Sequence, residues 1–328
     1  AYSISIDNTL LNNNLYDIYY DAGATTKLSL RSSTLTCQSD YPYSDNPYLK
    51  SPYSPGTINN SGVYLNNSAS SAIQIGDYGN SNYINTFRNM NYGIHAIYSS
   101  ITVYNNNFLH MKGLPYLCSY PKVCPYTGIA ILADGSSGNI NYPPTAIIGG
   151  TLPNQLNYIQ DCWRGVDIND YNQIYIENNI MTNTNNKAPF FNPTYGNHAI
   201  YVIIPDATTR GIAYCQYDVQ ISTNNITNFT TGIHVYGNLG TASLVPPFGD
   251  KSCSNNVGYI NINNNVLTTS PRGIMNTGML AEVTNSRIYD VLPVTISQNN
   301  ISIANYACIN LKNYWQHPTL GALIVDHN

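Results

Sequence analysis

Short stretches in which aliphatic and polar residues alternate recur along the chain, and most of them end in a pair of asparagines. In VQISTNNI, residues 219–226, Val219 and Ile221 alternate with polar residues before the two amides. The same pattern occurs in ITVYNNNF at 101–108, IYIENNI at 174–180, ININNNV at 260–266 and VTISQNNI at 294–301. Alternation with a period of two predicts short strands that are buried on one side.

A second alternating stretch follows each asparagine pair and begins with glycine. It starts seven residues after Asn225 and eight residues after Asn265. The examples are GIHAI at Gly93, GIAIL at Gly128, GVDI at Gly165, GIHV at Gly232 and GIMN at Gly273. Strands this short cannot bury a core alone, but repeating units stacked on one another bury a continuous one. The repeat therefore predicts a solenoid with loop insertions.

The amides and glycines have a physical role in such a solenoid. Asparagine tolerates the left-handed backbone conformation of a sharp bend, and a side chain turned inward can hydrogen-bond to its equivalent in the next coil. The predicted ladder consists of Asn107, Asn179, Asn225, Asn265 and Asn300. A second bend with positive φ is predicted at Gly93, Gly165, Gly232 and Gly273.

These two repeats resemble those of the right-handed parallel β-helix of the pectate-lyase-like superfamily, over residues 75–315. The expected fold is all-β, with residues 1–75 as a cap with the first irregular coil and residues 76–328 as the β-helix. The last residues, ALIVDHN, alternate like a strand, which leaves open that the helix continues beyond the end of the sequence. The composition, rich in Asn, Tyr and Ser, also resembles that of bacterial surface and adhesin proteins.

Composition and charge limit the classes of partner. Hydrophobic residues make up 43% of the chain and charged residues only 9%, with 30 tyrosines and a net charge of −4. Nucleic acids and anionic membranes bind clustered Lys and Arg, and no basic run exists, so neither is an expected partner. No apolar run approaches the ~20 residues of a membrane-spanning helix. The seven cysteines contain no C-x-x-C pair, and Cys118 and Cys124 are candidates for a local disulfide that would fit an exported protein.

The resemblance implies a polysaccharide as substrate or ligand, in a groove along one outer face. The Gly-strand pattern places one outward column at His95, Ala130, Asp167, His234, Met275 and Asn310. The densest charged group, WRGVDINDYN, gives Arg164, Asp167 and Asp170 as candidates for catalysis, and the outward column adds His234. Asp161, Asp167 and Asp170 are candidates for calcium, the one cofactor considered. Solvated polar residues between core aliphatics explain the same pattern, and the Asp-Asp and Gly-His-Gly signature of the related hydrolases is absent.

An uncharged outer face rich in hydroxyls and amides is predicted on the Asn strands. With Trp163 nearby, the candidates for glycan contact are Tyr104, Tyr175 and Glu177. A plain solvated sheet face is the alternative interpretation of these residues.

The sequence thus favours a secreted or cell-surface β-helix protein without catalytic activity, on a bacterial outer surface. Its function would be adhesion, glycan binding or assembly of a surface fibre, with a glycan or a protein as partner and with homo-oligomers allowed. Two alternatives stay open. One is a polysaccharide lyase or glycoside hydrolase with a site near Asp161–Asp170, and the other is a module like a phage tail spike.

Overall fold

The structure is a computed structural model, and it describes most of the repeats. The described residues are 3–12, 14, 16–21, 27–36, 61–68, 72–111, 128–135, 144–183, 198–204, 218–229, 231–237, 259–268, 281–285, 294–302, 309–312 and 323–327. These residues form three sheets of ten, nine and nine strands, here called sheets A, B and C. A single turn of 3-10 helix, η2 (Pro153–Gln155), is the one helical element among them.

Sheet A contains every third strand of the chain, in sequence order, and all its pairs are parallel. Its strands are β1 (Ser3–Asp7), β4 (Lys27–Arg31), β7 (Ala72–Ile75), β10 (Ile101–Val103), β13 (Thr145–Gly149), β16 (Gln173–Glu177), β19 (Asp218–Ser222), β22 (Tyr259–Asn263), β25 (Val294–Ser297) and β28 (Leu323–Asp326).

Sheet B is also parallel, and most of its strands have only three residues. They are β2 (Leu10–Asn12), β5 (Thr34–Thr36), β8 (Asn85–Arg88), β11 (Asn106–Leu109), β14 (Tyr158–Gln160), β17 (Ile180–Thr182), β20 (Asn225–Thr227), β23 (Val266–Thr268) and β26 (Asn300–Ile301).

Sheet C contains the longest strands, including most of the stretches that begin with glycine. They are β3 (Tyr16–Asp21), β6 (Ser61–Asn66), β9 (Tyr92–Ile97), β12 (Ile129–Asp134), β15 (Arg164–Asn169), β18 (His198–Ile204), β21 (Thr231–Gly237), β24 (Ala281–Asn285) and β27 (Ile309–Lys312).

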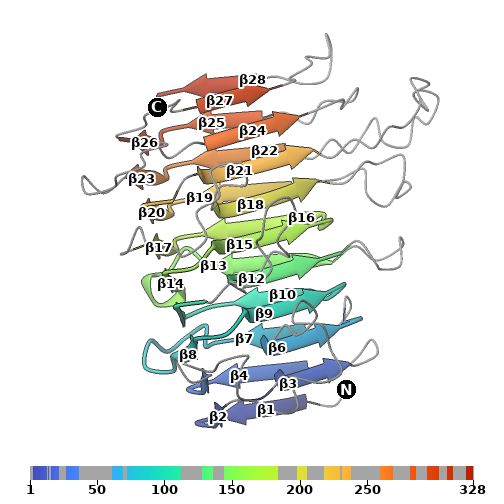
Figure 1. Ribbon diagram of the computed structural model, residues 1–328. Helices are drawn as coiled ribbons and strands as arrows, with labels where there is room; N and C mark the ends of the chain where they lie inside the picture. Colours follow the sequence, from blue (N-terminus) through green and yellow to red (C-terminus); the bar gives the residue numbers. More distant parts are fainter. Residues whose placement is uncertain are drawn as a thin grey trace, which may run out of the picture.

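The chain visits sheets A, B and C in turn and then returns to sheet A one level higher, which makes a right-handed parallel β-helix. Figure 1 shows the coils stacked from the N-terminal end to the C-terminal end. Parallel neighbours lie ~4.8 Å apart, so equivalent side chains of successive coils form columns. The predicted all-β solenoid is confirmed.

The core fills the space between the three sheets with aliphatic columns. On β16, for example, Ile174 and Ile176 are fully buried, whereas Tyr175 between them faces outward and is half-buried. Sheet B contributes one inward side chain per strand, and the rings of Phe87 and Phe108 stack there with centroids 4.8 Å apart. A coil cannot bury these faces by itself, so the stability of the solenoid comes from contacts between neighbouring coils.

The asparagine ladder exists at the corner between sheets A and B, but its members differ in part from the prediction. Hydrogen bonds from side chain to side chain, 2.8–3.0 Å long, connect Asn85, Asn106, Asn157, Asn179, Asn224, Asn265 and Asn299, all of them buried. Asn179 and Asn265 were predicted correctly. Asn107, Asn225 and Asn300 were not, because they are the first or second residues of sheet B strands and face outward or are exposed.

The corner geometry decides which asparagine of a pair turns inward. In the coils without an insertion, the residue before the ladder position has positive φ, as at Asn105, Asn178 and Asn264. In coils without an insertion, this left-handed residue lies two positions after the last inward aliphatic of sheet A, and the ladder residue follows it. The position of Ile221 therefore makes Asn224 the ladder residue of its coil, and the position of Ile262 does the same for Asn265.

The glycines that begin the sheet C stretches have a different role from the one predicted. Gly93 and Gly165 lie within strands, and the described glycines with positive φ are Gly76, Gly128 and Gly149. A Cβ on Gly93 would lie 2.5 Å from Cδ1 of Phe108 and 2.6 Å from the carbonyl oxygen of Ala130. Close packing against sheet B, and not a bend, therefore excludes a side chain there. Gly273 and Met275 lie outside the described residues.

The expected boundary near residue 75 does not interrupt the sheets. Strands β1 to β5 have the same order and register as the later coils, since β1 pairs with β4 and β4 pairs with β7. The part of residues 1–75 that the structure describes is thus regular β-helix, where a cap with an irregular coil was expected.

Candidate functional site

The outer face of sheet C gathers aromatic and ionisable side chains in two adjacent columns. Register places them there, because neighbouring strands are parallel and equivalent positions of successive strands lie one above another. One column contains Tyr16, Ser61, Tyr92, Ile129, Arg164, His198 and Thr231. The other contains Tyr19, Tyr64, His95, Leu132, Asp167, Tyr201 and His234.

The predicted column on the Gly strands is confirmed in part. His95, Asp167 and His234 share one column, and Asn310 is in register with it through Glu282. Ala130 does not belong there. It is aligned with Gly93 and Gly165, and Leu132 takes the expected place, because the strand begins one residue after Gly128.

At the N-terminal end of this face, three tyrosines from two coils form a cluster, here called the tyrosine group: Tyr16, Tyr19 and Tyr64. The rings of Tyr19 and Tyr64 stack with centroids 5.2 Å apart, and Tyr16 lies 4.8 Å from Tyr64. Tyr19 is 56% exposed. Burial and the neighbouring tyrosines raise the pKa of the Tyr64 phenol, so this phenol stays uncharged at physiological pH.

His95 and Tyr92 continue the aromatic face into the next coil. The His95 ring lies 5.1 Å from that of Tyr64, edge to face, and 4.9 Å from that of Tyr92. Burial lowers the pKa of His95 to about 4, although the Asp134 carboxylate opposes this shift. Burial also raises the pKa of Tyr92, with a further contribution from Asp167. Both rings are therefore neutral at pH 7.

Two coils further on, Arg164 and Asp167 form a buried ion pair, each 5% exposed. Burial raises the pKa of the Asp167 carboxyl, and the Arg164 guanidinium only partly offsets this effect. The guanidinium carbon lies 4.5 Å from the centroid of the Tyr201 ring, a cation–π contact. The ion pair and the contact with Tyr201 therefore fix the positions of the Arg164 and Asp167 side chains on this face.

His198 and His234 complete this second cluster. Nδ1 of His234 lies 3.2 Å from Nε2 of His198, and one ring nitrogen of the pair donates to the other. Both rings are also 4.9 Å from the ring of Tyr201. The catalytic candidates Arg164, Asp167 and His234 thus lie on one face within three consecutive coils, with Tyr201 between Asp167 and His234.

The other carboxylates of the predicted charged group do not join this cluster. Asp161 and Asp170 both have positive φ and lie before and after strand β15, so the whole strand, about 20 Å long, stands between them. Asp161 contacts Nδ1 of His110 at 3.1 Å, and Asp170 is buried at the corner between sheets C and A. Among the described residues, no group of three His, Cys, Asp or Glu side chains could hold a metal ion.

The predicted glycan contacts divide between two parts of the molecule. Tyr104, Tyr175 and Glu177 lie on the outer side of sheet A, all half-buried, and Oγ of Ser222 donates to Oε1 of Glu177 at 3.1 Å. Trp163 lies before β15, at the start of sheet C. The solenoid brings the first three residues onto one face and separates them from the tryptophan.

Sequence reasoning missed most of the aromatic members of sheet C: the tyrosine group, Tyr92, Tyr201 and His198. A signal was nevertheless present, since Tyr19, Tyr64 and Tyr201 each stand between two inward residues, in IYY, VYL and IYV. The pattern was hidden because β3 and β6 were assigned to a cap and β18 does not begin with glycine.

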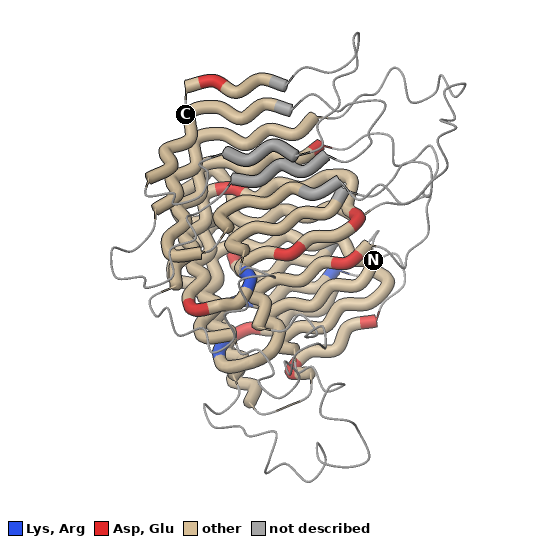
Figure 2. The backbone as a smooth tube through the Cα atoms, turned by 45° about the horizontal axis from the view of Figure 1, so that its top comes forward, with Lys and Arg blue, Asp and Glu red and all other residues tan. Residues whose placement is uncertain are grey.

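Of the seven cysteines, Cys162 is the one in the described part of the chain, where it is buried as a free thiol. The disulfide candidates Cys118 and Cys124 lie outside the described residues. Figure 2 shows that charged residues are few and scattered along the described part of the chain. None of the described helices is long and apolar enough to cross a membrane.

No protein-family model matches the chain, and no curated protein or solved structure matches it significantly. The architecture itself defines the class: three parallel sheets and a buried asparagine ladder make the protein a right-handed parallel β-helix. The pectate-lyase-like superfamily remains a resemblance in fold and repeat pattern.

Proposed function

We propose that the protein is a non-catalytic β-helix protein of the cell surface or the extracellular space that binds glycans along the outer face of sheet C. The tyrosine group is the observation that carries this proposal. Tyr19, Tyr64 and Tyr16 present stacked rings on rigid strands, with the ring of Tyr19 largely exposed. Rigid tyrosines supply large contact area and a hydroxyl at little cost in entropy.

The geometry of the columns fits an extended ligand. Equivalent side chains repeat every ~4.8 Å along the solenoid axis, so a linear polymer lying along sheet C would meet the tyrosine group and then His95. The rings of Tyr64 and His95 are neutral at pH 7, because burial raises the pKa of the tyrosine and lowers that of the histidine. Contacts with an uncharged polysaccharide would therefore consist of ring stacking and hydrogen bonds.

Affinity electrophoresis in native gels that contain plant, algal or bacterial polysaccharides tests this function. The wild-type protein should be retarded by at least one uncharged polysaccharide, and Tyr19→Ala and Tyr64→Ala should each weaken that retardation. Tyr259→Ala is the matched control, because this tyrosine is 42% exposed but lies on sheet A. Absence of retardation in every gel would refute the proposal and favour a protein partner, as in a surface fibre.

A second candidate function, cleavage of a polysaccharide, is favoured by the cluster around Asp167. The Asp167 carboxyl is buried and its pKa is raised, which suits a group that transfers a proton. Arg164 pairs with it, and His198 and His234 lie on the next two strands of the same face. Clearing of the stained glycan around the protein band would indicate an enzyme. If so, Asp167→Asn should abolish clearing without abolishing retardation, whereas retardation without clearing supports the non-catalytic function.

A further inference from the structure

The corner between sheets A and B carries two insertions that the solenoid does not need. Elsewhere this corner has only the left-handed residue and the ladder position, which is asparagine in all but the first two coils, as between β16 and β17. In two coils it is extended, by residues 76–84 between β7 and β8 and by residues 150–156 between β13 and β14. Each insertion still ends at a ladder residue, Asn85 or Asn157, so both are additions to an otherwise intact corner.

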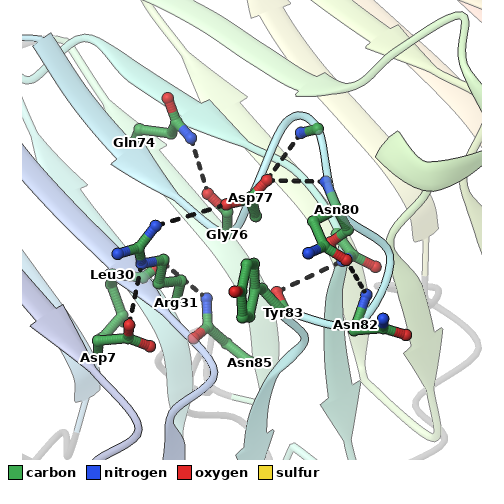
Figure 3. A network of polar contacts seen from close by, with 12 residues as sticks. Asp7, Leu30, Arg31, Gln74, Gly76, Asp77, Asn80, Asn82, Tyr83 and Asn85 are labelled. Atoms are coloured by element: carbon green, nitrogen blue, oxygen red, sulfur yellow. Dashed lines mark hydrogen bonds and ion pairs between the residues drawn. The ribbon is translucent and has the colours of Figure 1, made fainter.

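Hydrogen bonds hold the first insertion in one conformation. Oδ1 of Asp77 accepts from the backbone N–H groups of Gly79 and Asn80, at 2.7 and 2.8 Å. Nδ2 of Asn105 donates to the carbonyl oxygens of Asn80 and Tyr83, at 3.1 and 3.4 Å. Figure 3 shows Asp77, Asn80 and Tyr83 in this network, with Arg31 between Asp7 and Asp77.

The second insertion is fastened to the first and to the body of the solenoid. Nδ2 of Asn154 donates to the carbonyl oxygen of Tyr78 at 3.1 Å, and Nδ2 of Asn178 donates to that of Leu152 at 3.2 Å. The two insertions therefore form one ordered surface over the coil that contains Tyr104.

Apolar side chains on this surface remain in contact with solvent. Tyr78 is 56% exposed and Leu152 is 45% exposed. The Tyr78 ring lies 5.9 Å from that of Tyr104, tilted by 60°. The pKa of Tyr104 is raised, mainly by burial and to a smaller extent by the neighbouring Tyr78 and Glu177. A rigid turn that holds a large ring in solvent contributes nothing to the core, so this ring is available to contact a ligand.

Glu177 supplies a polar group beside the rings. Register aligns Tyr104 with Gly149 and Gly149 with Glu177, so a residue without a side chain stands between the ring and the carboxylate. Oε1 of Glu177 accepts from Ser222 at 3.1 Å, and both residues lie on the outer side of sheet A. Rings at one end and a carboxylate at the other offer stacking and hydrogen-bond acceptors to a ligand rich in hydroxyl groups.

We infer that Tyr78, Tyr104 and Glu177 form a second saccharide-binding site, which takes an uncharged glycan. Arg31, which lies beside the first insertion, is engaged by Asp7 and Asp77, and Glu177 would repel an anionic sugar. The corner between sheets A and B lies across the core from sheet C, so this site cannot belong to the same groove as the tyrosine group. The inference rests on the proposed function, because both sites bind glycans, but it assigns different residues.

Gels cast with glucomannan, xyloglucan, mixed-linkage β-glucan or dextran test the second site, with polygalacturonate and alginate for comparison. In at least one uncharged gel, Tyr78→Ala should raise the apparent dissociation constant at least tenfold, and Glu177→Gln should also weaken retardation. The control Tyr259→Ala should bind like the wild type. Because Tyr78 lies on an exposed turn, its variant should keep the melting temperature of the parent protein.

The outcomes separate the two sites. Binding that Tyr78→Ala and Glu177→Gln leave unchanged would overturn the second site, while loss of binding in Tyr19→Ala alone would still support the proposed function. Loss in Tyr78→Ala without loss in Tyr19→Ala would support the second site and refute the one on sheet C. Retardation only by polygalacturonate or alginate, or by no polysaccharide, would overturn the second site.

Discussion

Replacement of Asn224 by leucine tests the physical basis of the β-helix most directly. The Asn224 side chain makes four hydrogen bonds in the ladder. Its Nδ2 donates to the carbonyl oxygen of Ile176 and to Oδ1 of Asn265, at 2.8 and 3.0 Å. Its Oδ1 accepts from the backbone N–H and the Nδ2 of Asn179, at 3.0 and 2.9 Å. Leucine has the same number of side-chain heavy atoms in a similar branched arrangement, and it can make none of these bonds.

The magnitude follows from the groups left behind. An intramolecular hydrogen bond contributes ~1 kcal/mol, and a buried donor without a partner costs ~1–3 kcal/mol. The backbone N–H of Asn179 would lose its acceptor, so Asn224→Leu should lower the free energy of unfolding by about 3 kcal/mol. The entropy of unfolding, ~2.1 cal/mol/K per residue, gives roughly 0.7 kcal/mol/K for this chain. The melting temperature should therefore fall by about 4 °C.

The neighbouring residue provides the control. Asn225 is exposed at the start of β20, in register with Ile180 and Val266, which are partly exposed aliphatic residues. Asn225→Leu should change the free energy of unfolding by less than ~0.5 kcal/mol. Scanning calorimetry and urea denaturation of both variants would measure the difference. Equal effects of the two substitutions, or no effect of Asn224→Leu, would refute the assignment of the ladder.

Three further predictions follow from the packing and burial of single residues. Gly93→Ala should cost ~1–3 kcal/mol in urea denaturation through overpacking, whereas Gly79→Ala, whose Cβ would meet nothing closer than 3.8 Å, should be neutral; equal costs would contradict this reasoning. Burial lowers the pKa of His95 to about 4, below the unfolded-state value of ~6.5. The contribution of the neutral His95 ring to the free energy of unfolding is therefore fully present above pH ~6.5 and is lost as the pH falls toward 4. His95→Gln should flatten this loss between pH 7.5 and 4.5, and an unchanged slope would argue against burial as the cause. Burial raises the pKa of Cys162 to about 12, so peptide mapping at pH 8 should find it alkylated by iodoacetamide only after unfolding. Labelling of Cys162 in the native protein would contradict this.

The candidate sites were less predictable than the fold. The column of His95, Asp167 and His234 followed from the spacing of the Gly strands, because each residue occupies the same place between two inward aliphatics. The contacts of Tyr201 with Arg164 and His198 did not follow, since they depend on which coils are adjacent once the insertions are accounted for. The surface at Tyr78 and Leu152 was equally hidden, because separate insertions meet there only after the solenoid has formed.

The sequence by itself determined that the protein is a solenoid. A period of two within each strand and a longer repeat of aliphatic and asparagine positions leave stacking as the way to bury the aliphatic faces. Which asparagine of each pair faces the core was decided only by the tertiary structure. Two adjacent asparagines look alike in sequence, yet the left-handed residue before Asn224 turns that side chain into the core and leaves Asn225 in solvent.

Tertiary structure also decided the role of the glycines and the extent of the helix. Gly93 is required by the ring of Phe108 in another sheet, a contact that local sequence does not reveal. Strands β1 to β5 join the helix because their inward residues continue its columns, although their repeat is irregular in sequence. Local patterns specify which side of a strand is buried, whereas contacts between coils specify what each buried or outward residue meets.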